Sequence, residues 1–320
     1  MPTLSVCVLG AGSHSLAFHG PALKAIREES PLRCTLAAVC DLDAARAADY
    51  AREFGFARTY TDLEAMLEKE RPSAVIAVTP MERTLEIASR LLRRKVPVLI
   101  EKPPGIDTAQ ARQLLAVARE TGTPHMVSFN RRFSPAVAKA REWIAERQAA
   151  RPVRFLSAQM LRHKRREANF VAHTGIHLVD TVLSLMGPPA GAQAFRIATA
   201  DPASHLYGGR VTFAGGAAAE LLFASAVGRL EETYDLFGED WHIRVEWLSG
   251  AVEAFDGGKP SLSWKPSPDD SPVSLNGTLD ETREFLLCVE AGQRFQPDRF
   301  DRRQVHCQPH IPLGPKEDGR

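Results

Sequence analysis

A short apolar run followed by a glycine-rich turn constrains the fold more than any other feature of this chain. Ser5–Leu9 reads Ser-Val-Cys-Val-Leu, which is typical of a buried parallel strand. The turn after it resembles G-x-G-x-x-G, with a serine in place of the third glycine. Free N–H groups at the helix N-terminus behind such a turn attract a pyrophosphate. The sequence therefore predicts a dinucleotide site at Gly10, Gly12, Ser13, His14 and Ser15.

Apolar runs and helical segments alternate over the first 130 residues. This alternation predicts right-handed βαβ units and a parallel sheet with helices on both faces. We expect residues 1–130 to form an α/β, NAD-binding Rossmann domain. The expected strands are 5–9, 36–40, 74–78, 96–100 and 125–129, and the main helices are 19–29, 44–54, 85–94 and 108–121.

From residue 131 the pattern becomes that of an α+β domain. Several strand-like runs between 192 and 264 are separated by glycine pairs and polar turns, which favours hairpins in an open, largely antiparallel sheet. We expect this second domain to span residues 131–291. Residues 292–320 contain four prolines and few apolar residues, so they are expected to be an irregular or disordered tail.

Asp41 follows the second expected strand and bears on which dinucleotide is bound. A carboxylate there accepts hydrogen bonds from a ribose 2′-hydroxyl and repels a 2′-phosphate, which favours NAD over NADP. Asp41 lies 29 residues after Gly12, more than the usual ~20. The polar stretch 27–33 is the expected cause of this longer spacing.

Charge is nearly balanced overall but unevenly distributed. The net charge of +1 excludes a globally basic nucleic-acid binder. Residues 126–166 nevertheless carry 11 basic and 2 acidic side chains, a net +9. Arg131, Arg132 and the 162–166 cluster would attract an anionic substrate, such as a phosphorylated sugar or a nucleotide sugar. The alternative is a solvated loop, or a face that meets an acidic region of a neighbouring subunit.

The sequence also bears on the cellular compartment. It shows no basic N-terminal segment with a cleavage site and no apolar run of 18 residues, so we expect neither a secretory signal nor a membrane partner. The five cysteines lack paired spacing, which favours reduced thiols and a cytoplasmic location.

Further short motifs recur in a fixed order along the chain. They are His19-Gly20-Pro21, Thr79-Pro80, Glu101-Lys102-Pro103, Asn130-Arg131-Arg132-Phe133 and Gly175-Ile176-His177-Leu178-Val179-Asp180. In this order and spacing, about residues 3–290 resemble the glucose–fructose oxidoreductase/inositol dehydrogenase (Gfo/Idh/MocA) family.

The resemblance implies NAD(P)-dependent hydride transfer between nicotinamide and a hydroxyl or carbonyl of a sugar, cyclitol or similar molecule. It also implies a homodimer or homotetramer formed through the C-terminal sheet. Lys102 would hydrogen-bond the reacting oxygen, His177 would act as general base, and the Lys102-Pro103 bond would be cis. An ammonium stabilises a developing alkoxide and a histidine suits proton transfer near neutral pH. Further implied contacts are Thr79, Pro80, Glu101 and Asn130 to the cofactor, and Arg131, His163 and Asp180 to the substrate.

The chain departs from the family pattern at three places. His173 stands where relatives have an aspartate one helical turn before His177, and we expect it to assist catalysis. The His173/His177 spacing also suits a metal, but no third ligand is evident, so no metal is expected. The motif T-P-N-x-x-H lacks its Asn and His at residues 79–84, and the family's final helix is missing. These losses favour an alternative function, a non-catalytic dinucleotide-binding sensor or scaffold. A second alternative is a redox-neutral enzyme with tightly bound NAD. Lys102 and His177 favour the oxidoreductase.

Overall fold

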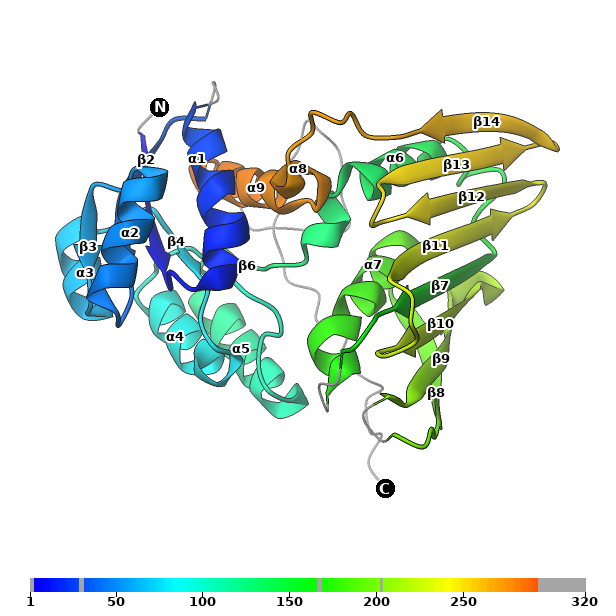
Figure 1. Ribbon diagram of the computed structural model, residues 1–320, viewed down its shortest axis with the longest axis horizontal. Helices are drawn as coiled ribbons and strands as arrows, with labels where there is room; N and C mark the ends of the chain where they lie inside the picture. Colours follow the sequence, from blue (N-terminus) through cyan, green and yellow to red (C-terminus); the bar gives the residue numbers. More distant parts are fainter. Residues whose placement is uncertain (1–2, 29–31, 166–168, 202–203, 293–320) are drawn as a thin grey trace. The chain divides into compact units, whose positions relative to one another are not determined.

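The computed structural model describes residues 3–28, 32–165, 169–201 and 204–292, which form two compact units (Figure 1). Unit 1 holds the described residues up to Ser128 together with 278–292, and unit 2 holds Phe129–Gly277. The expected domain boundaries differ in one respect, because helix α9 (Thr278–Glu290) lies in unit 1 rather than with 131–277. It packs on α1 (Gly20–Glu28), and its buried Glu281 accepts a hydrogen bond of 2.7 Å from Ser128. The expected tail lies, from residue 293 on, outside the described residues.

The sheet of unit 1 has six parallel strands in the order β3-β2-β1-β4-β5-β6. The chain order reverses between β1 and β4, and such a switch point is where parallel sheets bind ligands, beyond the carboxyl ends of the strands. The expected Rossmann-type α/β fold is confirmed. The strands are β1 (Leu4–Leu9), β2 (Cys34–Cys40), β3 (Arg58–Tyr60), β4 (Ala74–Ala77), β5 (Val98–Ile100) and β6 (His125–Val127).

Helices cover both faces of this sheet. The helices α3 (Leu63–Glu70), α4 (Met81–Arg93) and α5 (Thr108–Thr121) bury apolar side chains against one face, and α1 contacts α2 (Ala44–Phe54) and α9. The bounds of α2 and α5 match the expected 44–54 and 108–121. Both helices begin after an aspartate whose carboxylate accepts backbone N–H groups and end at a glycine in the left-handed conformation, which are strong start and stop signals.

Unit 2 contains an eight-stranded sheet in the order β14-β13-β12-β11-β7-β10-β9-β8. The strands β7 and β10 run parallel, and the other neighbouring pairs are antiparallel, which confirms the expected open, largely antiparallel sheet. The sequence pattern does not single out the edge strands β8 and β14, whose residues are mostly exposed and therefore show little alternation. The strands are β7 (Phe155–Leu161), β8 (Pro189–Ile197), β9 (Leu206–Phe213), β10 (Ala218–Ala224), β11 (Glu231–Gly238), β12 (Trp241–Glu246), β13 (Ala251–Asp256) and β14 (Lys259–Trp264).

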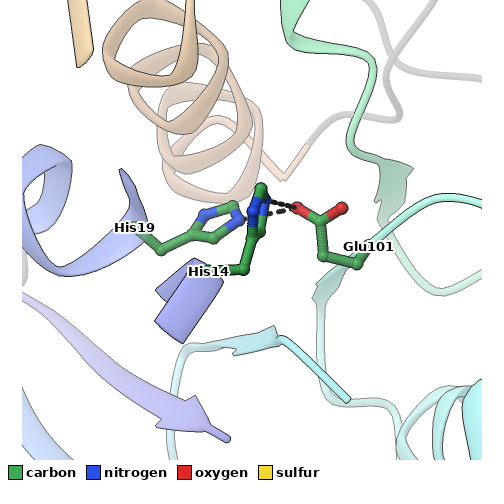
Figure 2. Close-up of side chains that lie close together, drawn as sticks. All are labelled: His14, His19 and Glu101. Atoms are coloured by element: carbon green, nitrogen blue, oxygen red, sulfur yellow. Dashed lines mark hydrogen bonds and ion pairs between the residues drawn. The ribbon is translucent and has the colours of Figure 1, made fainter. Parts of the chain in front are cut away.

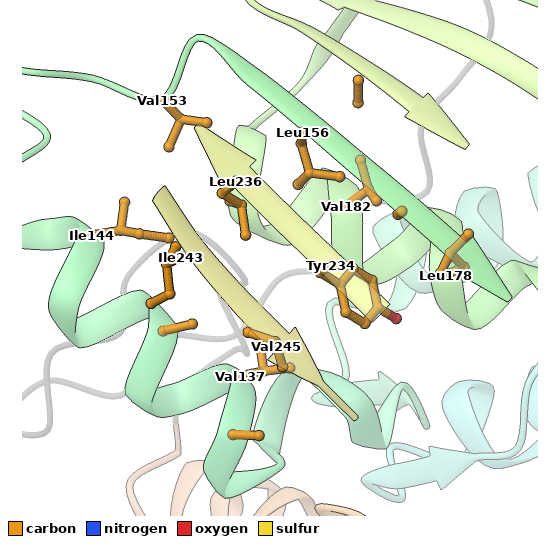
Figure 3. Packing of buried hydrophobic residues seen from close by; sticks show 14 of the residues in the cluster. Val137, Ile144, Val153, Leu156, Leu178, Val182, Tyr234, Leu236, Ile243 and Val245 are labelled. Atoms are coloured by element: carbon orange, nitrogen blue, oxygen red, sulfur yellow. The ribbon is translucent and has the colours of Figure 1, made fainter. Parts of the chain in front are cut away.

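Two helices bury one face of this sheet and leave the other open. Val137 of α6 (Pro135–Ala145) and Leu178 of α7 (Ile176–Met186) pack on Tyr234, Leu236 and neighbouring inward-facing residues (Figure 3). The opposite face carries the exposed side chains Phe195, Ile197, Phe237 and Phe255 and a hollow of about 480 Å³ over β7–β10. A short helix, α8 (Pro272–Leu275), follows the sheet.

Two further expectations concern membrane and cysteines. Within the described residues, no helix has the length and apolar character needed to cross a membrane. Cys7, Cys34 and Cys40 are free, buried thiols, as expected.

Candidate active site

The glycine turn after β1 has the geometry that the sequence predicts for it. Gly10 has a φ of +97°, and a Cβ there would lie 2.0 Å from the carbonyl oxygen of Val78. Its N–H donates to the carbonyl oxygen of Cys40 at 2.8 Å. A Cβ on Gly12, by contrast, would have no atom within 4 Å. The turn is therefore held tightly at Gly10 and faces open space at Gly12, where a ligand can approach the backbone.

Ser15 fills the place of the third glycine and joins two helices. Its side chain is fully buried, and its Oγ lies 2.9 Å from the hydroxyl oxygen of Tyr50 in α2. Residues Ser15–His19 form a π-helical turn that leads into α1. Ser13 and His14, which precede it, are exposed. The position thus keeps the close helix packing that the third glycine serves, and it adds a hydrogen bond.

Asp41 lies beside the glycine turn and is held in one orientation. One carboxylate oxygen accepts the N–H of Ala11 at 2.8 Å, and the other accepts the N–H of Asp43 at 2.9 Å and Arg46 Nη2 at 3.1 Å. Burial acts to raise the pKa of Asp41, but these two N–H groups and the guanidinium lower it overall. The carboxylate is therefore charged and fixed where a ribose hydroxyl could donate to it.

The segment Glu101-Lys102-Pro103 follows β5 at the same edge of the sheet. The Lys102-Pro103 bond is cis, which confirms the expectation from the motif. Lys102 is half-buried, and its N–H donates to Glu101 Oε2 at 3.2 Å. Thr79 and Pro80 follow β4 between these two segments, and Pro80 is the residue just before α4. Thr84, at the position of the missing histidine, is buried in α4.

Glu101 also makes contacts that the sequence analysis missed. Its Oε1 lies 3.1 Å from His14 Nε2 and 2.8 Å from His19 Nε2, so both imidazoles point at one oxygen (Figure 2). Burial acts to raise the pKa of Glu101, but the two histidines lower it overall. The strand order could have predicted these contacts. Because β1 and β5 flank β4, the loops at their carboxyl ends lie near each other.

In unit 2, Arg131 belongs to a buried charge cluster. Its guanidinium contacts Glu232 at 2.5 and 3.1 Å and stacks over Trp247 at 4.0 Å. Arg162 binds the same carboxylate, and Tyr234 donates to it at 2.8 Å. Burial acts to raise the pKa of Glu232, but Arg131 and Arg162 lower it overall. The cluster balances its own charge, as buried ions must.

The neighbouring Arg132 pairs with Asp180 through two hydrogen bonds of 2.5 and 2.6 Å, and both side chains are buried. Arg131, Arg132 and Arg162 thus have carboxylate partners within unit 2. The exposed part of the 162–166 cluster, within the described residues, is His163, Lys164 and Arg165. Any attraction for an anionic substrate therefore rests on this loop more than on Arg131, Arg132 and Arg162.

The two remaining catalytic candidates lie at the start of α7. His177 is buried, with its ring edge against Phe129 at 6.2 Å. His173 is half-buried in the π-helical turn Val171–Gly175 just before the helix. Asn130 donates to the carbonyl oxygen of Asn276 at 2.8 Å. Unit 1 therefore brings together the glycine turn, Asp41, Thr79, Pro80, Glu101 and Lys102, and unit 2 holds Asn130, Arg131, His163, His173, His177 and Asp180.

Comparison with known proteins agrees with this geometry. A switch-point sheet with a tight glycine turn and a fixed carboxylate after β2 is typical of a dinucleotide-binding Rossmann domain. Residues 4–129 match the family GFO_IDH_MocA, described as an oxidoreductase family with an NAD-binding Rossmann fold. Over these residues the chain is similar to the family that its motifs imply.

Relatives and solved structures extend the similarity beyond the first unit. The chain is 25% identical to UDP-N-acetylglucosamine 3-dehydrogenase of Acidithiobacillus ferrooxidans, over 89% of this chain and 88% of the relative. It is 26% identical to D-glucoside 3-dehydrogenase of Escherichia coli, over 58% and 55%. A dehydrogenase from Chromobacterium violaceum has the same fold, with a TM-score of 0.83, 19% identity and coverage of 93% and 91%. Levoglucosan dehydrogenase, solved with NADH and L-sorbose, matches with a TM-score of 0.80, 18% identity and coverage of 93% and 92%.

Proposed function

We propose that this protein is an NAD-dependent dehydrogenase that oxidises a hydroxyl group of a sugar, a cyclitol or a similar small molecule. The observation that carries the proposal is the edge of the unit 1 sheet. There the glycine turn, the fixed Asp41 carboxylate and Lys102 follow β1, β2 and β5. NAD would supply the hydride acceptor.

The residues of unit 1 suit a dinucleotide. The open space at Gly12 admits a pyrophosphate close to the backbone N–H groups of the turn. Asp41 would accept hydrogen bonds from the adenosine ribose, and its charge disfavours a 2′-phosphate. Thr79, Pro80, Glu101 and Asn130 are proposed as further contacts.

The chemistry of alcohol oxidation assigns a task to each catalytic candidate. The ammonium of Lys102 would stabilise the oxygen as its proton leaves. His177 would accept that proton, because an imidazole takes up and releases protons near neutral pH. His173, one turn earlier, would assist His177. Arg131, His163 and Asp180 remain proposed substrate contacts. Arg131 and Asp180 would make these contacts while held in their buried ion pairs with Glu232 and Arg132.

The substrate class we favour is a nucleotide sugar or another anionic sugar. The relative matched over most of its length is named for UDP-N-acetylglucosamine, and Lys164 and Arg165 are exposed on one loop. The test is to follow NADH formation with a panel of UDP-sugars, neutral sugars and inositols. Turnover of any member of the panel supports the dehydrogenase proposal, and turnover of the UDP-sugars supports the substrate class. Tight NADH binding without turnover of any member would favour the non-catalytic sensor. His173 and Thr84, which replace the family's aspartate and histidine, are compatible with that alternative.

Replacing Asp41 by asparagine should shift the preference between cofactors. The amide keeps an oxygen that accepts hydrogen bonds but lacks the charge that repels a 2′-phosphate, and Arg46 then lies beside the ribose site. We expect the ratio of NADPH to NADH affinity to rise at least about tenfold. Titration of both reduced cofactors by fluorescence measures it. Asp49→Asn, an exposed aspartate of the same helix region, should leave the ratio unchanged.

Replacing Gly10 or Gly12 by alanine should affect stability and cofactor binding differently. Gly10→Ala forces a Cβ against Val78 at positive φ and should lower the free energy of unfolding by at least about 2 kcal/mol. Gly12→Ala meets no neighbour and should change it by less than about 0.5 kcal/mol, yet weaken NADH binding. Denaturant unfolding and NADH titration check both. Equal stability of the two variants would contradict the geometry described for the turn.

We also propose that unit 2 assembles the protein into a homodimer or homotetramer. The supporting observation is the exposed apolar face of the sheet, with Phe195, Ile197, Phe237 and Phe255, since large apolar patches commonly mark interfaces. Sedimentation analysis measures the state, and Phe195→Asp should shift it towards the monomer.

A further inference from the structure

His14, His19 and Glu101 form a group whose shared geometry the proposed function does not explain, although His14 and Glu101 are also expected near the cofactor. The described residues contain one group of at least three His, Cys, Asp or Glu side chains able to share an ion, and this is it, with its ligand atoms all within 4.8 Å of one another. Figure 2 shows both imidazole nitrogens directed at the same carboxylate oxygen. We propose that this group is a binding site for a divalent transition-metal ion of the Zn²⁺ type.

The distances suit such an ion with little rearrangement. With bonds of 2.0–2.2 Å, the ligands of tetrahedral zinc lie about 3.3 Å apart. Glu101 Oε1 is 3.1 Å from His14 Nε2 and 2.8 Å from His19 Nε2. A small outward shift of His14, whose side chain is 50% exposed, makes room for the ion while the buried His19 and the largely buried Glu101 stay in place.

The donor set selects the kind of ion. Two imidazoles and one carboxylate are ligands that zinc and similar transition metals prefer, whereas Mg²⁺ and Ca²⁺ take oxygen ligands. Three protein ligands also leave a fourth position open in a tetrahedral site. His14 is half-exposed, so an ion can reach the group from solvent.

A backbone contact orients one of the three ligands. Glu101 Oε2 accepts the N–H of Lys102, which orients the carboxylate. His19 ends the π-helical turn before α1, and the rings of His14 and His19 lie 5.8 Å apart, centre to centre. The ion would therefore bridge the loop after β1 to the loop after β5, and it should stabilise unit 1 against unfolding.

Calorimetric titration with Zn²⁺ tests the site on the full chain, without an affinity tag and without dinucleotide. We expect one Zn²⁺ per chain and at least about tenfold weaker binding in His14→Ala and in Glu101→Gln. His242→Ala is the matched control, because His242 also pairs with a carboxylate, Asp235 at 2.9 Å, but belongs to no group of three ligands within the described residues. Its affinity for zinc should equal that of the parent chain.

Thermal unfolding gives a second readout that does not depend on catalysis. Zinc should raise the melting temperature of the parent chain and of His242→Ala, but not of His14→Ala, whereas Mg²⁺ should have no effect. His14 is exposed, so its variant should fold even where Glu101→Gln does not. Absence of zinc binding, or equal binding by the parent chain and His14→Ala, would overturn the proposal, and either result leaves the dehydrogenase proposal untouched.

Discussion

Lys102→Met should reduce kcat/KM by about two to four orders of magnitude, with NADH affinity nearly unchanged. Methionine keeps the length and apolar stem of the side chain but removes the ammonium. The loss would thus fall on the step in which negative charge develops on the substrate oxygen, where removing a positioned donor or acid typically costs this much. Steady-state kinetics with the best substrate of the panel, together with fluorescence titration of NADH, measures both quantities.

Lys24→Met is the control for this experiment, because Lys24 lies exposed on α1 of the same unit. Its kinetics should match those of the parent chain. If Lys102→Met lost NADH affinity and kept kcat, the lysine would be a cofactor contact instead of a catalytic group. The proposal that the substrate's reacting oxygen lies beside Lys102, at the end of β5, would then be wrong.

Glu232→Ala should lower the free energy of unfolding by about 3–5 kcal/mol. The substitution leaves Arg131 and Arg162 buried without the carboxylate that neutralises them, and it removes the acceptor for Tyr234. Denaturant unfolding monitored by tryptophan fluorescence measures the change. Trp247, which stacks on Arg131, should report the loss locally.

A pH series gives the same ion cluster a second test. Because the pKa of Glu232 is lowered in the folded protein, its contribution is complete above its ordinary value of 4.5 and is lost as pH falls through the lower native value. The difference between parent and Glu232→Ala should therefore shrink in acid. Glu253→Gln, at an exposed position on β13, should stay within about 0.5 kcal/mol of the parent at every pH. A similar small effect for Glu232→Ala would contradict the buried pairing.

Much of unit 1 could be predicted because its signals are local. The strand β1, the turn at Gly10 and the helices capped by Asp43 and Asp107 each follow from a few adjacent residues. The edge strand β3 has too few buried residues for a pattern. Helix α9 shows why boundaries are harder, since its place in unit 1 rests on contacts with α1 and with Ser128, which are distant in sequence.

The candidate site divides in the same way. Gly10, Asp41 and the cis bond at Lys102 could be predicted from motifs. The partners of charged groups could not, because nothing near Arg131 in the sequence points to Glu232, 101 residues away. This is why the positive segment suggested a larger anion-attracting surface than the structure leaves exposed. The His14–His19–Glu101 group was missed for the same reason.

The position of α9 has a consequence for how this chain is made. Because residues 129–277 are inserted into unit 1, the ribosome completes all of unit 2 before it adds the helix that packs on α1. A nascent chain ending near residue 130 therefore holds a parallel sheet whose α1 surface is still uncovered. We expect that a fragment of residues 1–130 will aggregate on expression, and that supplying α9 as a joined segment will restore a soluble, folded product.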